Sequence, residues 1–219
     1  METREALFAT SYLPPIGYMA YMLRYRKIGI EYCESYVKQS YRNRAEIMTA
    51  NGRLKLSVPV EKRAGSHTMT KEIGISYAEP WNVRHWRAIE SAYRAAPYFL
   101  YYKDRIEEAM MGRYDRLVEL NERLLNELLT MLKIDCEIEG TSDFVEEGTR
   151  PEIDDYRYTI GPKKQIEGLL FESYDQVFAE RHRFEPNLSI VDLLFNIGPA
   201  SKGYLQRVVA SSERAKGTL

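Results

Sequence analysis

The chain begins with a hydrophobic run, a helical stripe and a second hydrophobic run. Residues 7–11 have the length and composition of a short buried strand, which Pro14 and Pro15 interrupt. Proline is tolerated in the first turn of a helix. Apolar residues then recur at helical spacing, at Ile16, Met19, Ala20 and Leu23. Residues 30–33 form another strand-like run. This strand–helix–strand opening predicts an α/β sheet.

The clearest local pattern is that of a β-hairpin. Asn51-Gly52 is the strongest two-residue signature of a type I′ turn. Leu54, Leu56 and Val58 alternate with polar residues, which predicts one buried and one solvated face. We therefore expect strands near 41–49 and 53–60, with these three side chains facing the core.

The rest of the chain combines helical stripes with one acidic segment. Helices are predicted over 82–96 and 104–133, and a further strand over 169–171. Ser189 and Asp192 have the spacing of a capping-box variant at the start of a helix, and a last helix follows over about 200–209. Residues 135–155 hold nine acidic side chains and one basic one, which predicts an acidic, loop-rich surface excursion.

Composition limits the class of protein. The chain has 219 residues, of which 44% are hydrophobic, enough for one domain with a sizeable core. We expect a single domain over 1–219 of the α/β class, whose mixed sheet opens with strand–helix–strand and a β-hairpin and packs against several helices. No apolar run approaches the length of a membrane span, and the acidic start, Met1–Glu5, is unlike a signal peptide. Two isolated cysteines favour a reduced, cytoplasmic protein.

The net charge of −1 conceals an asymmetry, because residues 1–103 carry a net +7 and residues 104–219 a net −8. A basic N-terminal half is suited to an anionic small molecule such as a nucleotide sugar or an acyl donor. Alternatively, the two halves neutralise each other within one globule. The absence of a long basic tract argues against nucleic acid as a partner.

The first polar cluster is Gln39-Ser40-Tyr41-Arg42-Asn43-Arg44. In a regular strand Arg42 and Arg44 point to the same face, and guanidinium groups bind carboxylates or phosphates bidentately. The alternative is an exposed strand face whose arginines pair with acidic residues of the C-terminal half.

A second cluster surrounds His85, which lies between Trp81 and Trp86. A histidine in this setting is a candidate general base beside an aromatic substrate wall. The alternative is a structural histidine packed in the core, and no serine or cysteine can be tied to it as a nucleophile. No metal-binding or cofactor-binding motif occurs in the chain, so the sequence identifies no metal ligand and no cofactor.

A third cluster contains Tyr174 and Gln176, together with Asp192. Tyrosines beside amides line many sugar and nucleotide sites, although tyrosine-rich protein interfaces are an equal alternative. For Asp192 the simplest role is to cap its own helix.

Taken together, these segments resemble the WbqC-like protein family in order and spacing. The resemblance rests on residues 12–18, 39–44, 51–52, 58–60, 81, 85, 93, 96–99, 186–196 and 198–199. The family's opening motif usually reads His-Gln-Pro-x-Tyr-Leu-Pro-Trp. Here Phe8, Ala9 and Pro15 occupy the positions of its histidine, glutamine and tryptophan.

The resemblance implies a role in bacterial surface polysaccharide biosynthesis, where an acyl- or aminoacyl-transfer reaction on amino sugars has been suggested for family members. On this basis we expect a transferase with His85 as the base. The expected substrate-binding residues are Tyr12, Gln39, Arg42, Asn43, Arg44, Trp81, Tyr174 and Gln176. Because the opening histidine is absent, the rival hypothesis is a non-catalytic binding or scaffold protein of a glycan assembly pathway.

Overall fold

A four-stranded parallel sheet is the largest sheet of the computed structural model, which describes residues 5–61, 67–162, 164 and 169–216, with side chains through residue 209. The strands lie in the order β7-β2-β1-β8. Their bounds are Glu5–Ala9 for β1, Lys27–Glu31 for β2, Glu137–Gly140 for β7 and Ile153–Asp155 for β8. Helix α1 (Ile16–Met22) connects β1 to β2, so the predicted strand–helix–strand opening is confirmed.

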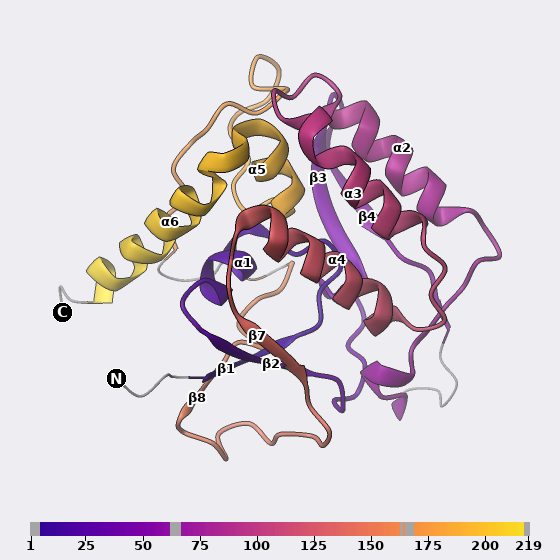
Figure 1. Cartoon of the computed structure of the whole chain (residues 1–219), viewed down its shortest axis with the longest axis vertical. Coiled ribbons are helices and arrows are strands. Elements are labelled where there is room, and N and C mark those ends of the chain that lie inside the picture. Colours follow the sequence, from indigo (N-terminus) through magenta and orange to yellow (C-terminus); the bar gives the residue numbers. More distant parts are fainter. Residues whose placement is uncertain (1–4, 62–66, 163, 165–168, 217–219) are drawn as a thin grey trace.

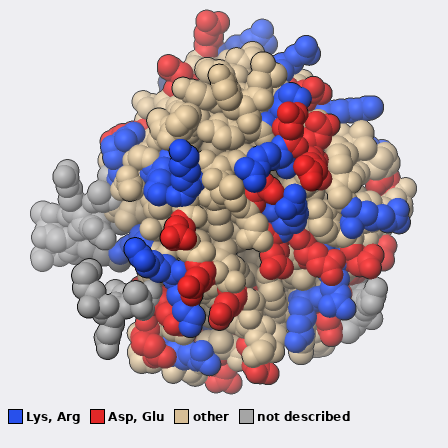
Figure 2. All heavy atoms as spheres, viewed as in Figure 1, with Lys and Arg blue, Asp and Glu red and all other residues tan. Residues whose placement is uncertain are grey.

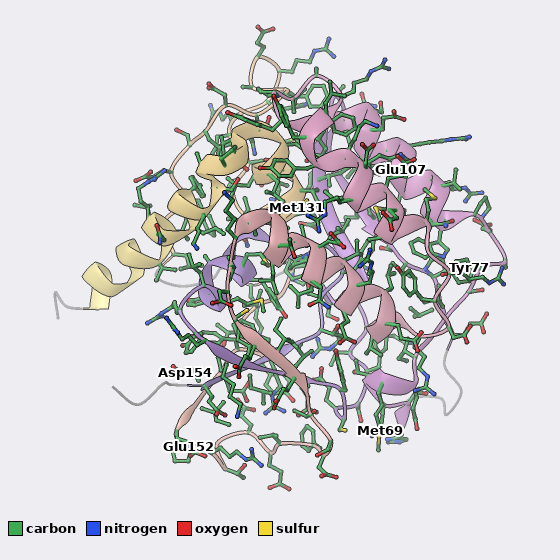
Figure 3. The ribbon with its side chains drawn as sticks, viewed as in Figure 1. Met69, Tyr77, Glu107, Met131, Glu152 and Asp154 are labelled. Carbon is green, nitrogen blue, oxygen red and sulfur yellow. The ribbon has the colours of Figure 1, made fainter. Side chains whose placement is uncertain are left out.

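The remaining helices gather on one side of the sheet, as Figure 1 shows. They are α2 (Trp81–Tyr93), α3 (Phe99–Met111), α4 (Leu117–Leu132), α5 (Ile190–Ile197) and α6 (Ser201–Lys216). Helix α1 packs against α5 and α6, and α3 packs against α2, α4 and α5. One hydrophobic core joins the sheet to these helices. Figure 3 shows side chains filling this space, with Asp154 of β8 and Tyr77 on opposite sides of the molecule. The predicted α/β class is therefore confirmed.

The hairpin is present, but its turn differs from the prediction. Strands β3 (Arg44–Thr49) and β4 (Gly52–Ser57) pair in antiparallel fashion, with Thr49 opposite Gly52. Two residues, Ala50 and Asn51, thus form the loop. A type I′ turn needs positive φ at both central residues, whereas in this turn only Gly52 has it, at +100°. The turn is therefore the kind that ends in a left-handed glycine.

The predicted buried face of the hairpin is correct at Leu56 and Val58 and wrong at Leu54, which is 38% exposed. Its partner across the hairpin, Ile47, is fully buried. The difference arises because α2 packs on β3, whereas no helix packs on β4 to a similar extent among the described residues. Sequence alternation identified the face but not how far the core extends along it.

The helix predicted over 104–133 is two helices, separated at residues 112–116. A Cβ on Gly112 would lie 2.5 Å from the hydroxyl of Tyr114, so a larger residue at this break would have to displace the tyrosine ring. Short strands β5 (Val60–Glu61) and β6 (Gly74–Ile75) pair beside this break, and Ile75 donates its N–H to the carbonyl of Asp115. Backbone hydrogen bonds to a distant segment therefore replace the helical ones. The helix predicted over 82–96 ends earlier, at residue 93.

The acidic segment 135–155 contains two strands that the loop-rich prediction missed. Both edge strands of the central sheet, β7 and β8, lie within it, at 137–140 and 153–155. The residues between them, 141–152, form a loop on the side of the sheet away from the helices (Figure 1). The strand predicted over 169–171 is wrong: the chain is irregular there, and Leu170 is 63% exposed.

Ser189 precedes α5 as predicted, but the capping box does not form. The Ser189 hydroxyl donates to the carbonyl of Leu13 at 2.9 Å instead of capping the helix. The carboxylate of Asp192 accepts hydrogen bonds from Tyr93 and Tyr174. Both side chains therefore form hydrogen bonds with residues outside α5 and do not cap the helix.

Candidate ligand-binding site

The first helix N-terminus of an α/β sheet is a common anion site, but in this chain other groups occupy it. The N–H of Ile16 donates to the carbonyl of Leu188 at 2.9 Å. The N–H of Gly17 donates to Oδ1 of Asn187 at 2.8 Å. Because α/β proteins bind their ligands at the carboxyl edge of the sheet, the other positions along this edge are the candidates for a ligand site.

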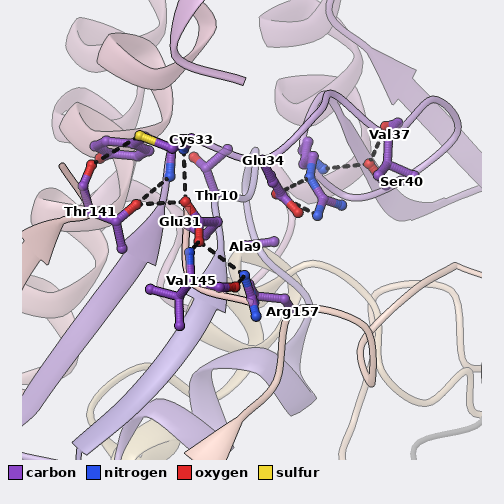
Figure 4. Close-up of polar contacts among 12 residues, drawn as sticks. Ala9, Thr10, Glu31, Cys33, Glu34, Val37, Ser40, Thr141, Val145 and Arg157 are labelled. Carbon is purple, nitrogen blue, oxygen red and sulfur yellow. Dashed lines mark hydrogen bonds and ion pairs between the residues drawn. The ribbon is translucent and has the colours of Figure 1, made fainter. Parts of the chain in front are cut away.

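Two buried glutamate–arginine pairs lie at this edge, and the first is saturated. Glu31 ends β2, and Arg157 follows β8 (Figure 4). Nη1 of Arg157 donates to Oε2 of Glu31 at 2.9 Å and to the carbonyl of Val145 at 2.6 Å. Nε and Nη2 both bond to Asp155. The side chains of Arg157 and Glu31 have no exposed surface.

Glu31 is equally well satisfied. Its Oε1 accepts from the N–H of Cys33 at 2.8 Å and from the hydroxyl of Thr141 at 2.6 Å, while Oε2 also accepts from the N–H of Val145. These bonds tie β2 to the loop that follows β7, and Arg157 extends the network to β8. We interpret this pair as structural.

The second pair, Glu34 and Arg42, is not saturated. Nε and Nη2 of Arg42 both approach Oε1 of Glu34, at 2.7 Å and 2.6 Å. Oε2 of Glu34 is buried and has no hydrogen-bond partner among the described residues. The Nη2 contact is close enough for an ion pair but lacks hydrogen-bond geometry. Burial raises the pKa of the Glu34 carboxyl, although the charge of Arg42 opposes the shift.

A cavity of about 310 Å³ opens beside this second pair. Residues from two segments that are distant in sequence form its walls, one within 37–42 and the other within 157–162 together with Lys164. Four basic side chains line it, those of Lys38, Arg42, Arg157 and Lys164, and no acidic residue is among its described lining residues. Tyr158 adds an aromatic surface. This cavity is large enough for a sugar or a small anionic group.

Of the predicted site residues, Gln39 and Arg42 lie together in this cavity. Gln39 is held in the left-handed region, with φ of +57°, which is uncommon for a residue other than glycine. Arg42 precedes β3, so regular strand alternation does not apply to it. Both Arg42 and Arg44 lie near Tyr36, where they oppose the rise in the pKa of its phenol caused by burial.

His85, Tyr12 and Trp81 form a separate buried cluster that does not line the cavity. Nδ1 of His85 lies 3.0 Å from the hydroxyl of Tyr12, and the imidazole packs edge-on against Trp81. Burial lowers the pKa of His85 to about 4, so the ring is neutral at pH 7. These contacts are those of a core histidine.

Tyr174 and Gln176 form a third group around Asp192. Tyr174 Oη donates to this carboxylate, and Gln176 Nε2 donates to the same oxygen at 3.0 Å. Gln176 also exchanges hydrogen bonds with the backbone of Glu185. The group holds the segment before α5 against the core. Asn43 makes a structural contact as well, donating to the carbonyl of Val58 at 2.9 Å.

Sequence reasoning missed Glu34, Arg157 and Lys164. The rule that ligands bind at the carboxyl edge of parallel strands points to Arg157 once β8 is known to be a strand. In the sequence, however, β8 has only three residues and lies in an acidic segment. Its signal was therefore obscured by the surrounding charges.

On the face of the molecule drawn in Figure 2, the asymmetry of charge along the sequence is not evident. Figure 2 shows acidic and basic side chains interspersed over one face of the molecule. Within the described ranges, no group of three or more histidine, cysteine, aspartate or glutamate side chains is placed to hold a metal ion. The helices in those ranges are too short or too polar to cross a membrane.

The fold and the cavity define an α/β protein with a basic cavity at the carboxyl edge of a parallel sheet. The chain belongs to the WbqC-like protein family, whose model matches residues 10–160. It is also similar to an uncharacterised protein of Mycobacterium tuberculosis, Rv1507c, with 27% identity over 226 residues that cover 93% of this chain and 97% of the relative. No solved structure matches the chain.

Proposed function

We propose that the protein is a transferase that modifies an amino sugar in bacterial surface polysaccharide biosynthesis, and that its cavity binds the anionic donor or acceptor. Membership of the WbqC-like family supports the pathway. The observation that carries the proposal is the cavity itself, with four basic side chains and no acidic one among its described lining residues. The ligand is a nucleotide sugar or an acyl donor such as a coenzyme A thioester, because both carry a pyrophosphate.

Three cavity residues have distinct roles in this proposal. Lys164 is exposed, and its ammonium group provides a mobile positive charge for a phosphate. The guanidinium group of Arg42 is held in place by Glu34 and provides a positive charge with a fixed orientation. Gln39 supplies an amide that can donate to and accept from a sugar. His85 has no part in this binding, because its imidazole lies in the core beside Tyr12.

Isothermal titration calorimetry with UDP, UDP-glucosamine and acetyl-coenzyme A tests the binding. We expect at least one of these ligands to bind, and Lys164→Ala to weaken its affinity about 10-fold, which corresponds to one charge-assisted hydrogen bond. Lys55→Ala is the matched control, since Lys55 is an exposed lysine on β4 outside the cavity. The proposal fails if none of the three ligands binds, or if both variants lose affinity equally.

The second candidate function is a non-catalytic binding protein of the same pathway. It is favoured by the absence of the family's opening histidine, since Phe8 occupies that position. Incubation with UDP-glucosamine and acetyl-coenzyme A together, followed by mass spectrometry of the sugar, separates the two functions. An acylated product indicates the transferase, whereas binding without product indicates the binding protein.

A further inference from the structure

The Glu34–Arg42 pair is an incomplete match. An arginine and a carboxylate in fork-to-fork geometry use both carboxylate oxygens, as Arg157 does with Asp155. Arg42 instead directs two nitrogens to Oε1 of Glu34. Oε2 of Glu34 and Nη2 of Arg42 are therefore both buried and without a hydrogen-bond partner among the described residues. Buried polar groups are nearly always paired in native proteins, so this pair needs an explanation.

Two further unpartnered atoms belong to residues bonded to the same pair. Thr70 donates its N–H to the carbonyl of Glu34 at 2.9 Å, and Asn121 donates its Nδ2 to the carbonyl of Arg42 at 2.8 Å. Oγ1 of Thr70 and Oδ1 of Asn121 are buried without partners. The four residues of this group are each at most 4% exposed; they are Glu34, Arg42, Thr70 and Asn121. The group thus offers mainly hydrogen-bond acceptors, beside one arginine.

This acceptor-rich group adjoins the basic cavity through Arg42, which belongs to both. Tyr158 lines the cavity and lies close enough to the pair for its phenol pKa to respond to both charges. Glu34 raises this pKa, and Arg42 lowers it. The site is therefore polarised, with the ammonium groups of Lys38 and Lys164 on the cavity wall and acceptors beyond Arg42. A phosphate has only acceptors at neutral pH and is unsuited to the second part.

We infer that Glu34 and Thr70 select the sugar part of the ligand, by accepting hydrogen bonds from its hydroxyl or amino groups, while its phosphates lie against Lys164. This inference rests on the proposed function and adds an orientation to it. Arg42 lies between the two parts and can donate to either of them. Glu34 and Thr70 are specificity-determining residues in this arrangement.

The test compares the affinities of UDP and UDP-glucosamine, which share the nucleotide and differ in the sugar. We expect the wild type to bind UDP-glucosamine about 10-fold more tightly than UDP, the difference expected from one or two buried hydrogen bonds. In Glu34→Gln an amide N–H replaces an acceptor oxygen, and the preference for UDP-glucosamine over UDP should fall below about twofold. Glu46→Gln is the control, since Glu46 is buried and paired with Arg53 outside the cavity.

Thr70→Val provides a second variant that keeps the charge and nearly the shape. If Thr70 binds the sugar, the preference for UDP-glucosamine falls and UDP affinity does not. If its hydroxyl is only a structural group, the preference stays at the wild-type value, and this outcome overturns the inference. Equal losses for both ligands in Glu34→Gln also overturn it and leave the proposed function standing. If the wild type binds neither nucleotide, the orientation is overturned, and acetyl-coenzyme A alone then decides the proposed function.

Discussion

The two buried glutamate–arginine pairs at the carboxyl edge of the sheet have similar composition and differ in how fully their atoms are used. Arg157 distributes its donors over Glu31, Asp155 and the carbonyl of Val145. Arg42 directs its contacts to a single oxygen of Glu34. A saturated pair contributes to the fold and has little left to offer a ligand. An unsaturated pair beside a cavity still has hydrogen-bonding capacity. Burial of an ion pair therefore does not by itself show whether its arginine has hydrogen-bonding capacity left for another group.

The largest effect is expected for Arg157→Ala, which removes the saturated pair. Loss of this side chain leaves Glu31 buried without a counter-charge, which typically costs about 3–5 kcal/mol of unfolding free energy. Urea denaturation measures the loss. The control is Arg84→Ala, because Arg84 forms an exposed pair with Glu79 whose loss costs about 0–1 kcal/mol. Equal effects of the two variants would contradict the structural role of Arg157.

A smaller effect is expected for Arg42→Ala. Arg42→Ala also leaves a buried carboxylate, Glu34, without its counter-charge. Because Arg42 makes fewer hydrogen bonds than Arg157, we expect the loss of unfolding free energy to lie at the lower end of the range of about 3–5 kcal/mol. The same urea titration orders the two arginines. A larger loss for Arg42→Ala than for Arg157→Ala would show that Arg42, and not Arg157, contributes more to the stability of the fold.

His85 differs from the two arginines because it is buried without a counter-charge among its described contacts. The dependence of its stability contribution on pH measures this difference. Burial lowers its folded-state pKa from the ordinary 6.5 to about 4, so the unfolded chain takes up the proton first as the pH falls. The stability that the neutral ring contributes is complete above about pH 6.5 and is lost as the pH falls toward 4. Between pH 7.5 and 5 the loss is about 2 kcal/mol.

The variant His85→Gln isolates this contribution, because glutamine does not titrate and can still accept a hydrogen bond from Tyr12. The difference in unfolding free energy between wild type and variant should shrink by about 2 kcal/mol from pH 7.5 to pH 5. Parallel pH profiles for the two proteins would show that His85 titrates normally. Other buried carboxyls, such as those of Glu34 and Asp192, cancel in this difference.

The smallest effect on stability is expected for Lys164→Ala. Lys164 is exposed, and its ammonium group contacts the carbonyl of Tyr158, so the unfolding free energy should change by no more than about 0.5 kcal/mol. The loss of nucleotide affinity proposed above should therefore occur in a protein of wild-type stability. Thermal denaturation of the same sample checks this. A marked fall in Tm would place Lys164 among the structural residues.

Local patterns in the sequence predicted much of the fold and little of the site. The α1 stripe and the β3–β4 hairpin follow from side-chain periodicity, which short-range sterics and burial impose directly. The break between α3 and α4 depends on hydrogen bonds from β6, some forty residues earlier in the chain. The spacing of apolar residues within 104–133 does not reveal such distant partners. Strand β8 was missed because three residues are too few for alternation to be recognised. The expectation of one domain over the whole chain stays a prediction.

For the candidate site, the sequence by itself determined that Gln39 and Arg42 lie in a polar segment next to a strand, and that the chain resembles the WbqC-like family. Only the tertiary structure decided that Arg42 meets Glu34 and that Arg157 and Lys164 complete the cavity wall. It also placed His85 in the core. The physical reason is that chemistry at a site depends on which side chains converge and which donors remain unused, and both are set by contacts between segments far apart in the chain.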